Sequence, residues 1–176
     1  DEDHPIRPIS AYGLSKWTME CYLKIMFDNL MRVSILRLAN VYGPRQDPNG
    51  EAGVVSIFAH RMLRDEPVVI FGDGEQTRDF VHVGDVVEAY QLVQDLMGSV
   101  TVNVGSATPT TVNEVFRVSA SEIGYSKVPI YEAERDGDVR YLVLNNERAK
   151  SLLGWFPKTS FQVGLHNTVD WIRSQS

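Results

Sequence analysis

The sequence predicts an α/β fold, and three observations lead to that prediction. Segments rich in β-branched residues alternate along the chain with segments of helical periodicity. The β-rich segment at 33–41 is largely apolar, as in a strand buried in a parallel sheet. Turn signals such as Gly43-Pro44 and Gly72-Asp73-Gly74 close the β-rich segments. The 176 residues are enough for about one compact unit, with no internal repeat and no interdomain linker.

The first half of the chain is predicted to run from a helix into a strand. Pro8 disfavours helix upstream and Ser10 is a suitable N-cap, so we expect a helix from 11 to about 30. Its apolar stripe is wide enough for packing on two sides. The next expected elements are a strand at 33–41, a helix at 54–64 that ends before Pro67, and strands at 68–71 and 77–83.

The second half continues the alternation. We expect Asp85 to cap a helix that runs to about residue 96. A strand at 100–104, a helix at 111–123 and an extended segment at 128–131 follow. A short helix capped by Asn145 or Asn146 should end at Gly154, and a last helix should cover about 161–173.

The composition argues against several classes of protein. Lys and Arg number 17 against 23 Asp and Glu, so the net charge is −6, which disfavours a dedicated nucleic-acid or membrane surface. No apolar run approaches the roughly 18 residues needed to span a bilayer. One cysteine, Cys21, excludes an intrachain disulfide, and the four histidines lack metal-ligand spacing, so no metal is expected. These features favour a reducing, cytoplasmic setting.

Tyr12 and Lys16 stand four residues apart on the first predicted helix, so both side chains project from one face. An ammonium beside a phenol stabilises the phenolate form. A phenolate is a competent general base for an alcohol proton. The pair is also compatible with two ordinary surface residues, because this spacing occurs by chance on many helices.

The residues around this pair resemble a known superfamily. Ser10-Ala-Tyr12-Gly-Leu-Ser-Lys16 is similar to the Tyr-x-x-x-Lys active-site helix of the extended short-chain dehydrogenases/reductases. Further motifs look like the nucleotide-sugar epimerase/dehydratase family (UDP-glucose 4-epimerase-like), in family order over essentially the whole chain. They are Leu36-Arg-Leu-Ala-Asn40-Val-Tyr-Gly-Pro-Arg45, Ile70-Phe-Gly-Asp-Gly, Thr77-Arg78-Asp-Phe-Val-His-Val-Gly-Asp85, Asn103-Val-Gly-Ser, Arg135-Asp-Gly-Asp138 and Leu152-Leu-Gly-Trp155.

The resemblance implies a chemistry with NAD as cofactor. Tyr12 would take the proton of the sugar 4-hydroxyl while the C4 hydride passes to NAD+, and the 4-keto sugar would be reduced on its other face. Lys16 would bind the nicotinamide ribose and activate the phenol. Leu38 is assigned to the cofactor side on the same resemblance.

The resemblance also assigns a site for a nucleotide sugar, most simply a UDP-sugar. The implied roles are sugar binding by Asn40, the nucleobase slot by Val55, Val69 and Phe71, the diphosphate clamp by Arg78 and Arg135, the ribose acceptor by Asp138, and the gate between hexose and N-acetylhexosamine by Leu142. At the last position a side chain smaller than Tyr would leave room for an N-acetyl group. Taken alone, Arg78 could instead pair with Asp79 or Asp85, and Arg135 could be a solvated loop charge.

By the same resemblance, the chain corresponds to the C-terminal part of an extended Rossmann-type enzyme. Residues 1–45 would hold the active-site helix and the following Rossmann strand, and 46–176 mainly the nucleotide-sugar-binding region. The glycine-rich NAD turn and the catalytic Ser or Thr are not in these residues. We expect such a chain by itself to be inactive, to bind NAD weakly, and to form a homodimer or higher oligomer through the helix around 11–30.

A UDP-hexose 4-epimerase segment is the leading interpretation, favoured by the loop at 47–58. A nucleotide-sugar 4,6-dehydratase or uronate decarboxylase segment stays open, as does a truncated, inactive protein that binds sugar nucleotides or dimerises. A generic small short-chain reductase is disfavoured, because such enzymes lack the long C-terminal region with its paired arginines.

Overall fold

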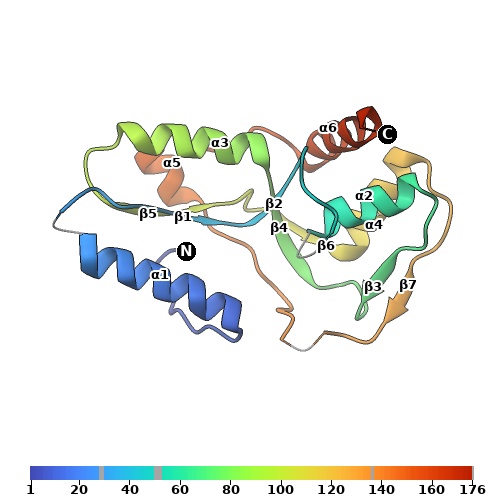
Figure 1. Ribbon diagram of the computed structural model, residues 1–176, viewed down its shortest axis with the longest axis horizontal. Coiled ribbons are helices and arrows are strands. Elements are labelled where there is room, and N and C mark those ends of the chain that lie inside the picture. The colour runs from blue at the N-terminus through green and yellow to red at the C-terminus, as the bar shows by residue number, and fades with distance from the viewer. Residues whose placement is uncertain (28–29, 50–52, 136, 176) are drawn as a thin grey trace.

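The computed structural model describes residues 1–27, 30–49, 53–135 and 137–175, and Figure 1 shows its elements. The helices are α1 (Ala11–Phe27), α2 (Val54–Leu63), α3 (Val83–Leu92), α4 (Val112–Ile123), α5 (Glu147–Leu153) and α6 (Phe161–Ser174), with a 3₁₀ turn η1 (Val93–Asp95). The strands are β1 (Ser34–Leu38), β2 (Asn40–Tyr42), β3 (Val69–Phe71), β4 (Thr77–His82), β5 (Val100–Val104), β6 (Pro109–Thr111) and β7 (Ile130–Glu132).

The strands of the described residues form three small sheets, mostly parallel. β1 pairs with β5, β2 with β4, and β3 with β7, each in parallel. β6 pairs antiparallel with β4, which makes a three-stranded sheet in the order β2-β4-β6. The α/β prediction therefore holds, with the helices packed against these strands.

The strand expected over 33–41 is in fact two strands. β1 follows β5 as far as Ala39, whose N–H still donates to the Val104 carbonyl at 2.9 Å. From Asn40 the chain changes partner and runs beside β4. The apolar run continues through the change, so the sequence pattern contains no sign of it. β6 was also missed, because three residues that include Pro109 make too weak a strand signal.

Asp85 does not cap α3, so that prediction was wrong. The helix begins two residues earlier, and His82 is its N-cap, accepting from the Gly84 N–H at 3.2 Å. Asp85 lies in the first turn, buried, and accepts from the Thr159 N–H and hydroxyl at 3.1 and 3.2 Å. The helix ends at Leu92 rather than near 96, and the 3₁₀ turn follows.

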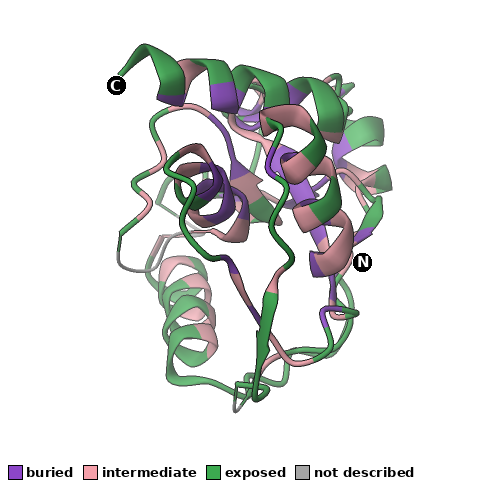
Figure 2. Ribbon diagram, turned by 90° about the vertical axis from the view of Figure 1, so that its right-hand side faces the viewer, coloured by how far each residue is buried: buried purple, intermediate pink, exposed green. Residues whose placement is uncertain are grey.

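Two apolar clusters hold the chain together. One joins α2, α4 and α6 to β3 and β4, and α6 turns its buried residues inward in Figure 2. The other lies between the β1–β5 sheet and the helices α3 and α5, and contains the fully buried Trp155. α1 lies on the opposite side of that sheet from α3 and α5 (Figure 1), tied to it by a two-bond ion pair between Glu20 and Arg37 at 2.8 and 2.9 Å.

α1 buries none of its residues within the described chain. Large apolar side chains are exposed on it instead: Tyr12, Leu14, Met19, Tyr22, Ile25 and Met26. Among the described residues no helix is both long enough and apolar enough to cross a membrane.

Candidate functional site

A cavity of about 800 Å³ lies between α2, β3 and the segment that follows β7. Its walls combine apolar side chains from α2 and β3 with the charged groups of Arg78 on β4 and of Glu132, Arg135 and Asp138. Most of the residues assigned to the nucleotide sugar line it, namely Asn40, Val69, Phe71, Arg78, Arg135 and Asp138. Residues far apart in sequence thus meet around one space large enough for a small-molecule ligand.

Arg78 is held in place by the protein itself. It projects from β4, donates to the Thr77 carbonyl at 2.9 Å and to the Val139 carbonyl, and forms an ion pair with Asp138. Its side chain is 14% exposed and that of Asp138 28% exposed, so the pair is largely shielded from water. The alternative partners Asp79 and Asp85 bind other groups.

Arg135 is in a different state. Its guanidinium carbon lies 3.8 Å from the centroid of the Phe71 ring, in a stacked cation–π contact. Within the described residues its N–H groups donate no hydrogen bond and join no ion pair. Of the two arginines assigned to the diphosphate, Arg78 is therefore held by the protein, while the guanidinium N–H groups of Arg135 donate to no described residue. This arrangement suits a ligand with several anionic oxygens.

Residues 138–144, which we call the strap, run beside β4 and form part of the site. The Thr77 N–H donates to the Arg140 carbonyl at 2.9 Å, and the Leu142 N–H donates to the Thr77 carbonyl at 3.1 Å. The Arg140 guanidinium binds Asp73, in the turn after β3, at 2.6 and 2.9 Å. These hydrogen bonds lower the pKa of the Asp73 carboxyl to about 2.

Two of the residues assigned to the nucleotide sugar do not line the cavity. Val55 points into the core and is 1% exposed, whereas Val54 and Ile57 on the next faces of α2 line the space. Leu142 is exposed on the strap and lies outside the cavity lining. Both assignments follow the family's motif positions, which do not specify the direction of a side chain.

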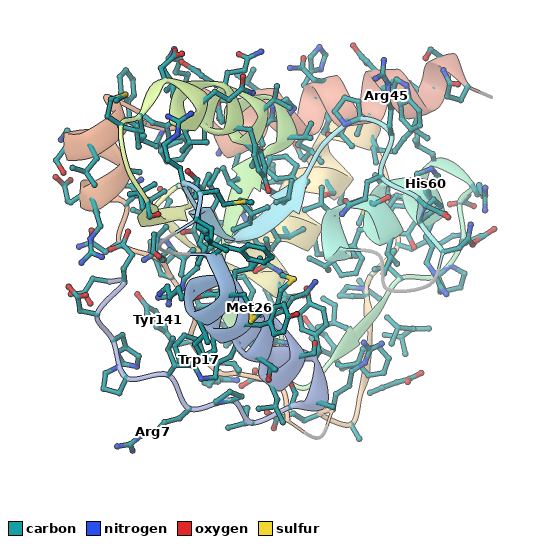
Figure 3. All side chains as sticks on the ribbon, turned by 60° about the vertical axis from the view of Figure 1, so that its left-hand side comes forward. Arg7, Trp17, Met26, Arg45, His60 and Tyr141 are labelled. Carbon is teal, nitrogen blue, oxygen red and sulfur yellow. The ribbon has the colours of Figure 1, made fainter. Side chains whose placement is uncertain are left out.

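Tyr12 and Lys16 come together as the helical spacing predicts. The Lys16 ammonium lies 5.2 Å from the centroid of the Tyr12 ring, and Tyr12 is 65% exposed. Neither residue lines the cavity. α1 runs along β1 and β5, while α2, β3 and β7 lie at the other end of the molecule (Figure 1). In Figure 3, Trp17 and Met26 on α1 lie well apart from His60 on α2.

Leu38, the residue assigned to the cofactor side, ends β1 and is 39% exposed. Leu38 does not line the cavity, although Asn40, two residues later, does.

Three polar residues of the cavity wall were not predicted: Arg61, Gln76 and Glu132. Arg61 could have been found from helical periodicity, because Val54, Ile57, Phe58 and Arg61 follow the i, i+3, i+4, i+7 pattern of one face of α2. Gln76 donates to the Phe71 carbonyl at 2.8 Å, across the turn that joins β3 to β4.

The chain is similar to a known protein family and to solved structures. The family model described as NAD dependent epimerase/dehydratase family matches residues 1–105. A UDP-glucose 4-epimerase of Mycolicibacterium smegmatis is 41% identical over 178 residues, which cover 99% of this chain and 56% of that protein.

Solved structures extend the similarity to the fold. The UDP-glucose 4-epimerase of Thermotoga maritima, solved with UDP-glucose, is 47% identical with a TM-score of 0.93, covering 96% of this chain and 55% of that one. The Thermus thermophilus UDP-glucose 4-epimerase, in complex with NAD, is 40% identical with a TM-score of 0.91, covering 100% and 58%.

The chain thus spans a little over half the length of each of these proteins. The similarity confirms both the expected Rossmann-type α/β fold and the family resemblance, including the link to NAD. Motifs, fold and comparisons agree, and the chain belongs to the NAD dependent epimerase/dehydratase family.

Proposed function

We propose that this chain is the substrate-binding and Tyr/Lys part of an NAD-dependent UDP-hexose 4-epimerase. One observation carries the proposal: guanidinium groups, carboxylates, amides and aromatic rings line a single cavity. A nucleoside diphosphate sugar carries the matching groups, namely a diphosphate, ribose and sugar hydroxyls, and a flat base.

Each part of this ligand is assigned to particular residues of the cavity. Arg135 and Arg78 take the diphosphate, the first with its free donors and the second with those that Asp138 and the strap leave unused. Asp138 accepts from the ribose, and Asn40 binds the sugar side. The slot for the base lies between β3, through Val69 and Phe71, and the cavity face of α2, next to Val55.

The reaction itself is assigned to α1. Tyr12 acts as general base toward the sugar 4-hydroxyl, and Lys16 holds the nicotinamide ribose and stabilises the phenolate. Both side chains fit this role, because within the described residues neither the Tyr12 hydroxyl nor the Lys16 ammonium has a hydrogen-bond partner, and Tyr12 is open to solvent. Leu38 contacts the cofactor. Bound NAD supplies reversible hydride transfer at C4.

Under this proposal residues 1–45 carry the catalytic helix and residues 46–176 mainly the nucleotide-sugar site. We also propose that the protein is cytoplasmic and forms a homodimer through α1, whose exposed apolar side chains a second copy of the helix would cover. Light scattering at micromolar concentration tests the dimer, and a monomeric mass would contradict it.

The function is tested by binding and by turnover. We expect these residues to bind UDP, measured by calorimetry, and, when joined to the NAD-binding half of a relative, to convert UDP-glucose into UDP-galactose in the presence of NAD. Tyr12→Phe should lower turnover by about 10²- to 10⁴-fold without changing UDP affinity. Tyr22→Phe, another exposed tyrosine on α1, is the matched control and should leave both unchanged.

Other outcomes would contradict the proposal. Release of a 4-keto-6-deoxy sugar would indicate a dehydratase, and loss of CO₂ from a UDP-uronate would indicate a decarboxylase. UDP binding without any turnover by the joined protein would favour a protein that only binds the sugar nucleotide, and no UDP binding at all would remove the proposal's main support.

A further inference from the structure

The Asp79 carboxylate is buried and accepts four hydrogen bonds. Asp79 is 1% exposed, directly after Arg78 on β4. Its Oδ1 accepts from the Ser106 N–H at 2.7 Å and from the Ser106 hydroxyl at 2.6 Å. Its Oδ2 accepts from the Ala107 N–H and the Leu144 N–H, both at 3.2 Å. One carboxylate therefore joins β4, the loop after β5 and the end of the strap.

The loop after β5 is built around this carboxylate. A Cβ at Gly105 would lie 2.3 Å from Asp79 Oδ2, so only glycine allows the loop to approach this closely. Ala107 has a left-handed φ of 58°, an uncommon backbone conformation for a residue with a Cβ. Among the described residues no cation pairs with Asp79, so main-chain N–H groups and one hydroxyl compensate its charge.

β4 and the strap meet at three consecutive residues of the strand. Thr77 bonds the strap through its backbone, and Arg78 through its guanidinium at Asp138 and Val139. Asp79 bonds the last residue of the strap, Leu144. Because side chains alternate along a strand, Arg78 faces the cavity while Asp79 points into the protein, where its carboxylate cannot touch a ligand in that space.

We propose that Asp79 is a positioning residue for the nucleotide-sugar site. By holding Leu144, its carboxylate fixes the end of the strap and thereby the place of Asp138 against the ribose and against Arg78. The effect on binding is indirect, through the strap. The inference rests on the proposed function, since it uses the roles given there to Asp138 and Arg78.

A pair of alanine variants tests the inference. Asp79→Ala removes all four bonds, including the one to the strap, whereas Ser106→Ala removes one bond to the same carboxylate and none to the strap. Three quantities are measured in each: hydrogen exchange over residues 138–144, the Kd of UDP, and the ratio of the Kd of 2′,3′-dideoxy-UDP to that of UDP. The ratio reports the ribose contact, and a loss of overall stability alone would not change it.

We expect Asp79→Ala to speed exchange in the strap, to raise the UDP Kd about tenfold and to bring the ratio close to one. Ser106→Ala should change each quantity by less than about twofold. If Asp79→Ala fails to fold, esters replacing single main-chain amides take its place. An ester at Leu144 removes only the strap bond, and one at Ala107 removes a bond of equal length to the same oxygen.

The outcomes separate this inference from the proposed function. Unchanged strap exchange, or an unchanged Kd and ratio, in Asp79→Ala or the Leu144 ester would overturn the role of Asp79 while the proposed function stands. Equal effects of the Leu144 and Ala107 esters on the ratio would also overturn it. Absence of UDP binding by the unaltered protein would overturn the proposed function and this inference with it, and the exchange data would still report whether Asp79 holds the strap.

Discussion

Replacing Arg135 by alanine is expected to weaken UDP binding strongly while changing stability little. The Arg135 guanidinium stacks on the Phe71 ring, with 3.8 Å between its carbon and the ring centroid, and it donates no hydrogen bond to a described residue. Its removal therefore costs the folded protein only a cation–π contact at an exposed site, worth about 0.5–1 kcal/mol.

The expected loss of affinity follows from the chemistry of the bond. A hydrogen bond between charged groups contributes about 1.5–3 kcal/mol. Since about 1.4 kcal/mol corresponds to a factor of ten, the Kd of UDP should rise roughly 10- to 150-fold. Arg78→Ala should weaken binding comparably, but it also strips the Val139 carbonyl and the half-buried Asp138 of their partner. It should therefore lower the free energy of unfolding by about 1–3 kcal/mol.

Two measurements distinguish the arginines. Calorimetric titration with UDP at one ionic strength gives the affinity, and urea unfolding gives the stability. Arg117→Ala is the matched control, because its side chain is 74% exposed on α4 and its one ion pair, with Glu114, is long at 3.7 Å. This variant should change neither quantity measurably.

The reasoning fails if Arg135→Ala binds UDP as tightly as the unaltered protein. It also fails if Arg135→Ala and Arg78→Ala lose equal stability, since the two residues differ in what they hold in the free protein.

Two further predictions concern the scaffold. Gly164→Ala should lower the urea midpoint of unfolding, because the new Cβ would lie 2.2 Å from the Tyr42 hydroxyl oxygen. Overpacking of this kind costs about 1–3 kcal/mol. An unchanged midpoint would refute the close packing of α6 on β2. Hydrogen bonding to Glu122 and then the charge of Asp170 raise the pKa of His166. The stabilisation by protonated His166 is therefore complete below the ordinary pKa of 6.5, and it disappears as pH rises through the folded-state pKa. Unfolding of His166→Gln across this range should differ most from the unaltered protein at acidic pH, and a constant difference would contradict the assignment.

Helix ends and strands that depend on residues close in the sequence could be predicted well. Thr111 caps α4 by accepting from the Glu114 N–H at 3.1 Å, and Gly124 ends that helix in the left-handed region, so both ends match the expectation within a residue. Gly154 ends α5 in the same way, and β5 has the bounds expected from its β-branched residues. Caps and turns act over about four residues, and a sequence pattern records such interactions directly.

The errors in the fold come from contacts between distant segments. At Ala39 the chain leaves β5 as its hydrogen-bonding partner and continues beside β4. The apolar run 33–41 is compatible with one strand or with two. Asp85 resembles an N-cap by residue type, yet Thr159, more than 70 residues later, binds its carboxylate instead.

For the site, the motif positions named residues that lie together, but their contacts could not be read from the sequence. Arg78, Arg135 and Asp138 line one cavity, and only the structure shows that Arg78 pairs with Asp138 rather than with Asp79 or Asp85 and that Arg135 stacks on Phe71. Whether Val55 or its neighbour on α2 faces the cavity depends on how the helix is rotated against the core.

The sequence by itself determined the fold class, the order of the elements, most helix ends and the family, because periodicity, caps and motifs are local properties of the chain. Only the tertiary structure decided which strands pair, what each charged side chain binds, and that the strap is held to β4 through Thr77, Arg78 and Asp79. Those choices depend on packing and hydrogen bonds between segments that lie far apart in the sequence, and their geometry exists only once the chain has folded.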